Sequence, residues 1–237
     1  SSGIALTNIQ VQSGGNIEFT GTTTGSDGSR GVIMSNSTVE TTGNGSILIE
    51  GTSFGTGENN DGIRHAGVTL QTRGGGDITL TGRTNSTANL SDGTSLFDSQ
   101  ILSGGAINIT GVSSETSEAF TDGIVLVDVQ LQSQEDIQLT GTTTGGAGSE
   151  GIIVRDSRVE TTGNGNIFLE GTTLGENSSS GIVALPLDGE VIFRTSGTGD
   201  ITFIGTSQSN GLSSGIALTN IQVQSGGNIE FTGTTTG

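Results

Sequence analysis

The chain has 237 residues, of which only 29% are apolar and 43 are glycine, and it contains neither cysteine nor lysine. The lack of cysteine excludes disulfide bonds and thiolate metal sites. Seven arginines against 24 acidic residues give a formal charge of −17, which argues against nucleic acid as a partner because binding phosphates requires a basic patch, and the apolar runs are much too short for membrane insertion.

Residues 1–25 contain the basic pattern of the chain, three short segments in which apolar and polar residues alternate. Their apolar members are Ile4 and Leu6, then Ile9 and Val11, then Ile17 and Phe19. Alternation with a period of two predicts strands with one buried face. A glycine opens each copy of the pattern: Gly3, Gly31, Gly62, Gly93, Gly123, Gly151, Gly181 and Gly215. The regular spacing of these opening glycines predicts tandem coils of about 30 residues, within the range of known solenoid repeats.

The third segment of each coil is the most regular. Its apolar pairs are Ile17 and Phe19, Ile47 and Ile49, Ile78 and Leu80, Ile107 and Ile109, Ile137 and Leu139, Ile167 and Leu169, Ile201 and Phe203, and Ile229 and Phe231. A second glycine follows each pair: Gly21, Gly51, Gly82, Gly111, Gly141, Gly171, Gly205 and Gly233. We expect the insertions between coils to collect on one edge, between this second glycine and the next opening glycine, in stretches such as residues 83–92.

A single coil of this composition cannot bury its apolar residues alone, whereas stacked coils share a continuous core. Glycine and β-branched residues dominate the segments, and no apolar stripe has helical spacing. Connections between parallel strands are right-handed in nearly all proteins. The sequence therefore predicts an all-β protein, a right-handed single-stranded parallel β-helix (β-solenoid) with three short strands per coil.

The chain also repeats on a longer scale. Residues 1–25 recur without change as residues 213–237, and "VETTGNGSILIEGT" at residues 39–52 is closely related to "VETTGNGNIFLEGT" at residues 159–172. We expect one solenoid domain over residues 1–237, with seven coils in a unit of residues 1–212 and an overlap of residues 213–237 with the next unit of a longer array. Pro186 marks a departure from the standard coil.

Catalytic constellations are poorly represented. A nucleophilic triad would have to use His65, the single histidine, which aligns with Leu6 at an inward position and is expected to be a core or loop residue. Paired carboxylates for glycoside cleavage would be Glu50 with Glu170, about 19 Å apart at about 4.8 Å per coil, or Asp77 with Asp136, about 10 Å apart. The position shared by Asp77 and Asp136 carries Asn, Ser or Asp in most coils, which favours a turn.

A hydroxyl residue recurs two positions after the second glycine: Thr23, Ser53, Thr84, Ser113, Thr143, Thr173, Ser207 and Thr235. Regular threonine arrays are also found on ice-binding solenoids. The outward strand positions, such as Gln10, Glu18 and Gln130, are expected to hold no repeated threonine pairs. We therefore interpret the hydroxyls as partners of turn amides.

Two sets of acidic residues recur at fixed positions. The residue directly before the opening glycine is acidic in four successive coils, and we call Asp61, Asp92, Asp122 and Glu150 the first acidic rank. The residue five positions after the opening glycine is aspartate in three successive coils, and we call Asp98, Asp128 and Asp156 the second acidic rank. Carboxylates stacked one coil apart repel each other, which proton uptake, outward splaying or a bound cation would relieve. Calcium, which accepts six to eight oxygen ligands, is the candidate metal, and no other cofactor is expected. The alternative interpretation is that Asp-Gly is a favoured turn.

The repeats "SGGNIEFTGTTTG", "TTGNGSILIEGT" and "GGGDITLTGRT" resemble those of filamentous-haemagglutinin-like exoproteins of two-partner secretion. This resemblance covers the whole chain. It implies a right-handed β-helix exported by bacteria and displayed outside the cell or at its surface as an adhesin or matrix fibre.

We therefore expect a non-enzymatic fibre segment whose partners are further copies of itself, along the fibre or side by side, and cell-surface or matrix polysaccharide. Two alternatives stay open: a polysaccharide-acting β-helix enzyme, and an adhesin that binds its ligand with the variable loops.

Overall fold

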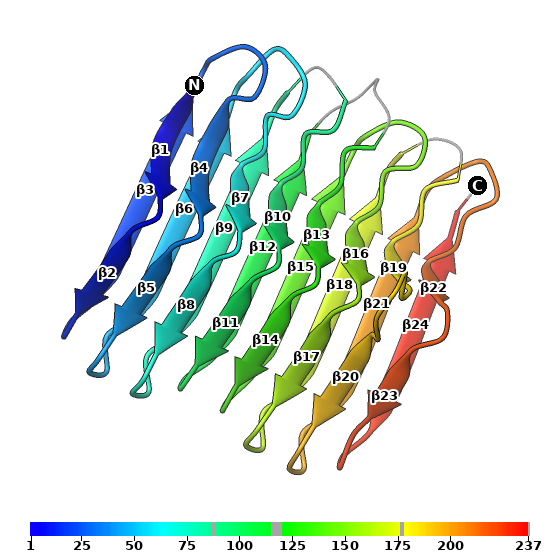
Figure 1. The fold of residues 1–237 in the computed structure, drawn as a ribbon. Helices are drawn as coiled ribbons and strands as arrows, with labels where there is room; N and C mark the ends of the chain where they lie inside the picture. Colours follow the sequence, from blue (N-terminus) through cyan, green and yellow to red (C-terminus); the bar gives the residue numbers. More distant parts are fainter. Residues whose placement is uncertain (87–88, 115–119, 176–177, 237) are drawn as a thin grey trace.

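The structure, a computed structural model, describes residues 1–86, 89–114, 120–175 and 178–236. The described residues form three parallel sheets of eight strands each, and none of them lies in a helix. Every coil gives one strand to sheet A, one to sheet B and one to sheet C, so that eight coils stack along one axis (Figure 1). The predicted all-β parallel β-solenoid with about 30 residues per coil is confirmed. No helix able to cross a membrane is found among the described residues.

The strand bounds follow the expected order of segments. Sheet A consists of β1 (Ser2–Thr7), β4 (Arg30–Ser35), β7 (Ile63–Ala66), β10 (Thr94–Phe97), β13 (Ile124–Val127), β16 (Ile152–Arg155), β19 (Ile182–Ala184) and β22 (Ile216–Leu218). Sheet B consists of β2 (Gln10–Ser13), β5 (Thr38–Thr41), β8 (Thr69–Thr72), β11 (Gln100–Ser103), β14 (Gln130–Ser133), β17 (Arg158–Thr161), β20 (Ile192–Thr195) and β23 (Gln222–Gln224). Sheet C consists of β3 (Ile17–Thr23), β6 (Ile47–Ser53), β9 (Ile78–Thr84), β12 (Ile107–Ser113), β15 (Ile137–Thr143), β18 (Ile167–Thr173), β21 (Ile201–Ser207) and β24 (Ile229–Thr235).

The coils stack in register, with equivalent residues directly opposite one another. Ile17 pairs with Ile47, Ile47 with Ile78, and Ile78 with Ile107, and the column continues to Ile229. In the inner coils these isoleucines are completely buried. Because one apolar column lies above the next, a chain poor in apolar residues still forms a continuous core.

Both glycine ranks have one structural cause. The opening glycine of sheet A lies against the second glycine of sheet C, so the two sheets approach backbone to backbone; we call this contact the glycine seam. A Cβ atom on Gly111 would lie 2.0 Å from the carbonyl oxygen of Gly123, and one on Gly93 would lie 2.2 Å from the amide nitrogen of Val112. No side chain fits there, which explains why each coil carries both glycines.

The A-to-B corner bends through a residue with left-handed backbone. This position is held by asparagine, aspartate or glycine at positive φ in Asn8, Asn36, Gly67, Asp98, Asp128, Asp156 and Asn220. These residue types adopt left-handed backbone more readily than others. The second acidic rank is therefore part of a corner that the backbone itself requires.

The expectation that insertions collect on one edge is wrong. The interval from a second glycine to the next opening glycine hardly varies along the chain, whereas the interval from an opening to a second glycine is clearly longer over residues 181–205 than over residues 3–21. The largest difference is the A-to-B connection of residues 185–191, which contains Pro186 and separates β19 from β20. Within the stretch 83–92 expected to hold an insertion, residues 87–88 lie outside the described residues.

Candidate functional site

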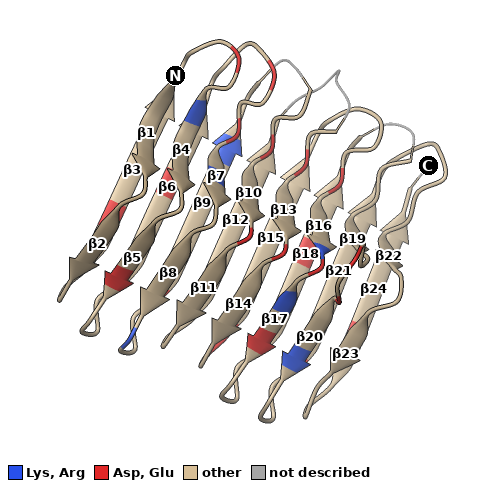
Figure 2. Ribbon diagram, viewed as in Figure 1, with Lys and Arg blue, Asp and Glu red and all other residues tan. Residues whose placement is uncertain are grey.

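The first acidic rank forms a ladder along the axis. The amide of Asp92 donates to Asp61 Oδ1 at 3.1 Å, the amide of Asp122 to Asp92 Oδ1 at 3.0 Å, and the amide of Glu150 to Asp122 Oδ1 at 2.7 Å. Asp61, Asp92 and Asp122 thus each accept the backbone amide of the acidic residue in the next coil. Figure 2 shows these acidic positions recurring just before β7, β10, β13 and β16. Stacked carboxylates and backbone donors therefore hold one another in register.

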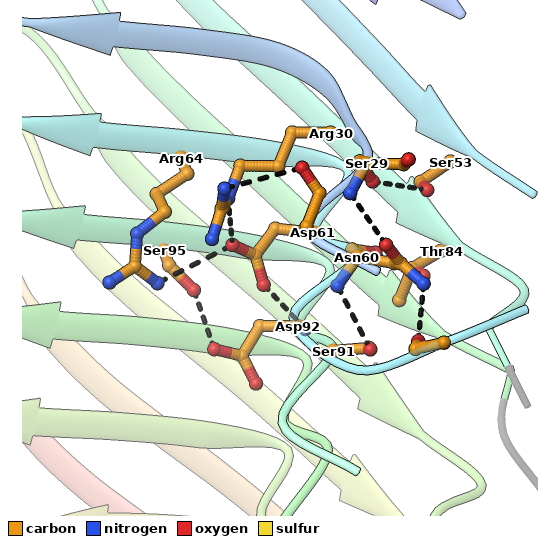
Figure 3. Close-up of polar contacts among 12 residues, drawn as sticks. Ser29, Arg30, Ser53, Asn60, Asp61, Arg64, Thr84, Ser91, Asp92 and Ser95 are labelled. Carbon is orange, nitrogen blue, oxygen red and sulfur yellow. Dashed lines mark hydrogen bonds and ion pairs between the residues drawn. The ribbon is translucent and has the colours of Figure 1, made fainter. Parts of the chain in front are cut away.

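Arginine neutralises one end of this ladder (Figure 3). Asp61 is fully buried, and its Oδ2 accepts from Arg30 Nε at 3.0 Å and from Arg64 Nη1 at 3.4 Å. Ser95 Oγ donates to Asp92 Oδ2 at 2.6 Å. These arginines were not anticipated from the sequence. A signal for one of them was present, because Arg30 directly precedes the opening glycine Gly31 and so occupies the position in coil 2 that Asp61 occupies in coil 3. Equivalent positions of neighbouring coils stack, which indicates the ion pair between Arg30 and Asp61.

The other end of the ladder has no such ion pair among the described contacts, and the pKa values of its acids are raised. Burial raises the pKa of Asp92 to about 7, and the charge of Asp61 adds to the rise. Burial, followed by the charges of Asp92 and Glu150, raises the pKa of Asp122 well above its ordinary value. Burial also raises the pKa of Glu150, against the opposing effects of a hydrogen bond with Asp122 and the charge of Arg155. Raised pKa values favour proton uptake, which would relieve the repulsion between stacked carboxylates.

The second acidic rank lines an open groove of about 570 Å³ on the A-to-B corner. Asp98, Asp128 and Asp156 are joined there by outward residues of sheet B and by Arg158 and Glu190. Asp156 binds the long A-to-B connection of the following coil, residues 185–191. Its Oδ1 accepts the amides of Leu187 at 2.8 Å and Gly189 at 2.9 Å. Burial acts to raise the pKa of Asp156, but these amides outweigh it and hold the pKa below its ordinary value.

The calcium hypothesis stays a prediction for both ranks. Within residues 1–86, 89–114, 120–175 and 178–236, no group of three or more His, Cys, Asp or Glu side chains converges as metal ligands. Of the seven candidate carboxylates, Asp61, Asp92 and Asp122 each give an oxygen to a backbone amide one coil away. Asp98 and Asp128 are exposed at the corner.

His65 lies in the core, as its alignment with Leu6 predicts. It is completely buried in the inward column of sheet A, between Met34 and Leu96 of the neighbouring coils. Neither ring nitrogen has a hydrogen-bond partner. Burial lowers the pKa of His65 to about 3, so the imidazole is neutral. Because neither ring nitrogen makes a hydrogen bond, His65 is not paired with a carboxylate of either acidic rank, as the histidine of a nucleophilic triad would be.

The acid pairs considered for glycoside cleavage take part in turns or stand far apart. Asp77 Oδ1 accepts the amide of Ala106 at 2.8 Å, and Asp136 Oδ1 accepts the amide of Asn166 at 2.7 Å. This confirms the turn role of their shared position. Glu50 and Glu170 occupy equivalent outward positions of β6 and β18, four coils apart.

The recurring hydroxyls point inward and serve the backbone, as predicted. Thr84 Oγ1 donates to the carbonyl oxygen of Asn60 at 2.6 Å and accepts the amide of Ser86 at 3.2 Å, and other members of the rank repeat one or both of these bonds. A neighbouring ladder of serine and asparagine side chains, which was missed from the sequence, accepts amides between coils. The side chains of Asn60, Ser91, Ser149 and Ser179 accept the backbone amides of Ser29, Asn60, Thr121 and Ser149, respectively.

Sheets B and C display repeated polar columns on their outward faces. Sheet B presents a glutamine-rich face, formed by Gln10, Gln12, Gln71, Gln100, Gln130, Gln132, Gln222 and Gln224. On sheet C, outward threonine pairs do occur, contrary to expectation, because the strands continue beyond the second glycine. Sheet C has three outward columns, which begin at Glu18, Thr20 and Thr22. Threonine fills the second and third columns together only in β3, β15 and β24, and the first and second together only in β9, so no contiguous two-column array forms.

Comparison with models of known protein families, with curated protein sequences and with solved structures finds no match to this chain.

Proposed function

We propose that this chain is a segment of a structural or adhesive fibre, exported by a bacterium and displayed outside the cell or at its surface. The observation that carries the proposal is the unbroken register of all three sheets through eight coils. Every outward position is thereby repeated once per coil, which suits a protein whose length and repeated surface determine its function. The recurrence of residues 1–25 as residues 213–237 supports the same role, because a fibre gains from additional copies.

The resemblance of the repeats to filamentous-haemagglutinin-like exoproteins supports this proposal at the level of family. It suggests two-partner secretion and a right-handed coil, the sense that parallel crossovers favour. The net charge of −17 agrees with a surface fibre that stays soluble and avoids anionic lipid. The proposal assigns the chain no catalytic step.

A second function, binding of neutral polysaccharide, is favoured by the glutamine-rich face of sheet B. Its amides offer both donors and acceptors to sugar hydroxyls, and two open grooves flank it. Gln100 and Gln130 lie directly opposite one another beside the groove of the second acidic rank. A ligand running along the axis would meet equivalent groups once per coil, about 4.8 Å apart.

Two measurements on the purified chain test these roles. Self-association is followed by sedimentation velocity and electron microscopy, and adhesion by retention on cellulose and on immobilised neutral glycans. We expect assembly, retention or both. A chain that stays monomeric and is not retained contradicts the fibre role, and release of new reducing ends from a polysaccharide would instead support the enzymatic alternative.

A pair of matched variants locates the adhesive face. Gln100→Ala with Gln130→Ala removes amides from sheet B, whereas Thr110→Ala with Thr140→Ala alters equivalent outward positions of sheet C. We expect only the glutamine variant to lose retention. Equal loss in both variants would assign binding to general surface properties instead of this face.

A further inference from the structure

Phe168 interrupts the polar outward face of sheet C. The first outward column of this sheet holds a polar residue in every coil except coil 2, which has Leu48, and coil 6, which has Phe168. Phe168 is half-buried, so part of its ring faces solvent. The fold does not require an aromatic residue there, because the equivalent coil 2 is built with leucine.

A pocket of about 290 Å³ is lined by Phe168 and spans three coils at the start of β15, β18 and β21, which are neighbours in Figure 1. Gln138 and Thr202 lie directly opposite Phe168 on the two neighbouring strands. Asp136 and Asp200 enter the pocket wall from the corners that precede β15 and β21. None of the residues that line the pocket is basic.

Both aspartates are fixed by backbone amides and keep a carboxylate oxygen for a ligand. Asp136 Oδ1 accepts the amide of Asn166 at 2.7 Å and its Nδ2 at 3.1 Å, and Asp200 Oδ1 accepts the amide of Asn228 at 2.5 Å. Among the described residues, none donates to Oδ2 of either aspartate. The pocket therefore combines one aromatic ring with two positioned carboxylate acceptors.

We propose that this pocket binds an amino-sugar unit, a sugar ring that carries a protonated amino group. The ammonium group donates to Oδ2 of Asp136 or Asp200, and the ring lies against Phe168. This inference goes beyond the proposed function, since it places a cationic ligand on sheet C, apart from the neutral polysaccharide proposed for sheet B.

The charge of the pocket selects a cation. Two carboxylates without a basic lining residue, on a chain of net charge −17, attract cations and repel anionic sugars. The negative face of the Phe168 ring attracts a cation as well. A hydrogen bond from an ammonium group to a carboxylate is stronger than one from a neutral hydroxyl, because both partners are charged.

The other lining groups favour a sugar ring over a bare ammonium ion. Quaternary ammonium ligands such as choline are recognised by cages of several aromatic rings, whereas Phe168 is the single aromatic residue among those that line this pocket. The Gln138 amide and the Thr202 hydroxyl offer donors and acceptors to sugar hydroxyls. An apolar surface with a few polar groups around it is typical of small-ligand sites.

Isothermal titration calorimetry of the purified chain tests the ligand with three probes: a short oligomer of β-1,4-linked glucosamine, the fully N-acetylated form of the same oligomer, and choline. We expect the glucosamine oligomer to bind and the other two to bind about tenfold more weakly or not at all, because only the first offers both the ring and the ammonium donor. Added NaCl should weaken the binding.

A pair of matched variants tests the aromatic residue. Phe168→Leu introduces the residue of coil 2 and should weaken binding of the glucosamine oligomer by about tenfold. Leu48→Ala changes the equivalent outward position of coil 2, outside the pocket, and should bind like the parent. Thermal melts monitored by circular dichroism establish that both variants are folded.

A second pair tests the carboxylates. Asp136→Asn with Asp200→Asn removes two charges but keeps the Oδ1 acceptors of the backbone amides, and should weaken binding by about tenfold or more. Asp77→Asn with Glu50→Gln removes two charges from coils 2 and 3, outside the pocket, and should leave binding unchanged.

Four results would overturn the proposal. Lack of binding of the glucosamine oligomer refutes the site, equal binding of the N-acetylated oligomer refutes recognition of the ammonium group, and equal binding of choline refutes recognition of the ring. Equal weakening by the pocket variants and their controls would assign binding to the overall negative charge. Each of these results leaves the fibre function to be decided separately, by self-association and by retention on neutral glycans.

Discussion

At the scale of single residues, the fully buried His65 and the half-buried Asp92 have opposite effects on how stability depends on pH. The unfolded histidine takes up a proton near pH 6.5, whereas the folded one stays neutral down to about pH 3. Stability that depends on neutral His65 is therefore lost as the pH falls through this interval. The unfolded aspartate loses its proton near pH 3.9, whereas folded Asp92 keeps it to about pH 7. Stability that depends on protonated Asp92 is lost as the pH rises.

Because the two effects oppose each other between about pH 4 and 6.5, removing either group should expose the other. In His65→Leu, melting temperature should fall as the pH rises from about 4 to 7. In Asp92→Asn, which keeps an oxygen for the Asp122 amide, the melting temperature should decrease less with rising pH than in the parent. Asp122 and Glu150, whose pKa values burial also raises, keep their own dependence on pH in this variant. Thermal melts monitored by circular dichroism check both slopes. Variants that follow the parent profile would contradict the burial of these side chains.

At pH 7, His65→Leu should also stabilise the fold. The imidazole is buried with both nitrogens unpaired, and leucine is the residue found at the same position in coils 1, 4 and 5, as Leu6, Leu96 and Leu126. Replacing an unsatisfied polar group by an apolar side chain of similar size removes a desolvation cost of about 1–3 kcal/mol. A lower midpoint of urea unfolding in the variant would be evidence against this explanation.

The glycine seam gives a second prediction at this scale. Gly111→Ala would bring a Cβ within 2.0 Å of the Gly123 carbonyl oxygen, so β12 and β13 must separate. We expect a loss of about 1–3 kcal/mol or more, as for other overpacked sites. Gly75→Ala is the matched control, because no atom lies within 4 Å of a Cβ there. Urea unfolding of both variants measures the difference, and equal midpoints would exclude a close contact at the seam.

At the scale of elements, the isoleucine column of sheet C carries the stacking of coils. Ile107→Asp places a carboxylate in a fully buried position between Ile78 and Ile137, which should cost several kcal/mol and unfold the neighbouring coils. Asn108→Asp introduces the same charge on the outward face of the same strand and should have little effect. Hydrogen exchange of the amides of β9, β12 and β15 separates the two cases. Similar protection in both variants would argue against a shared core.

The core of each element could be predicted from the sequence because a period of two is read from neighbours in the chain. The pair Ile47 and Ile49, or the pair Ile137 and Leu139, identifies its buried face without reference to other coils. Strand length was harder to predict, since the glycine of the seam interrupts the apolar pattern and residues 20–23 continue the strand through and beyond it.

The polar ladders of the site depend on distances that the sequence does not contain. The bond from the Asp122 amide to Asp92 Oδ1 joins residues 30 positions apart and requires both the stacking register and a side chain directed along the axis. Likewise, the left-handed corner that explains Asp98 and Asp128 becomes visible only with the backbone angles. The recurrence of these acids was evident from the sequence, whereas their partners were not.

At the scale of the whole molecule, acidic ranks that follow the axis predict a response to divalent cations. The carboxylates of Asp98, Asp128 and Asp156 stand at successive coils along one groove. If calcium binds between coils or between fibres, it should raise the melting temperature and promote bundling, because a cation shared by neighbouring carboxylates reduces their repulsion. Melts and light scattering with excess calcium and with chelator measure this effect.

The control replaces the same three residues by asparagine, which tolerates the left-handed corner and removes the charge. The triple variant should then behave alike in calcium and in chelator. A parent protein that is insensitive to chelator would leave these acids as corner residues whose charge serves solubility.

The parallel ladders have a mechanical consequence. All three sheets hold neighbouring coils together by backbone hydrogen bonds that run along the axis, and none of the described strands extends from one end of the stack to the other. A pulling force applied to the two ends therefore peels coils away one after another. Each released coil of about 30 residues supplies about 100 Å of extended chain, since one residue spans at most about 3.3–3.6 Å. If the proposed fibre is attached at a surface, it should therefore lengthen stepwise under load and dissipate mechanical energy before its attachment breaks.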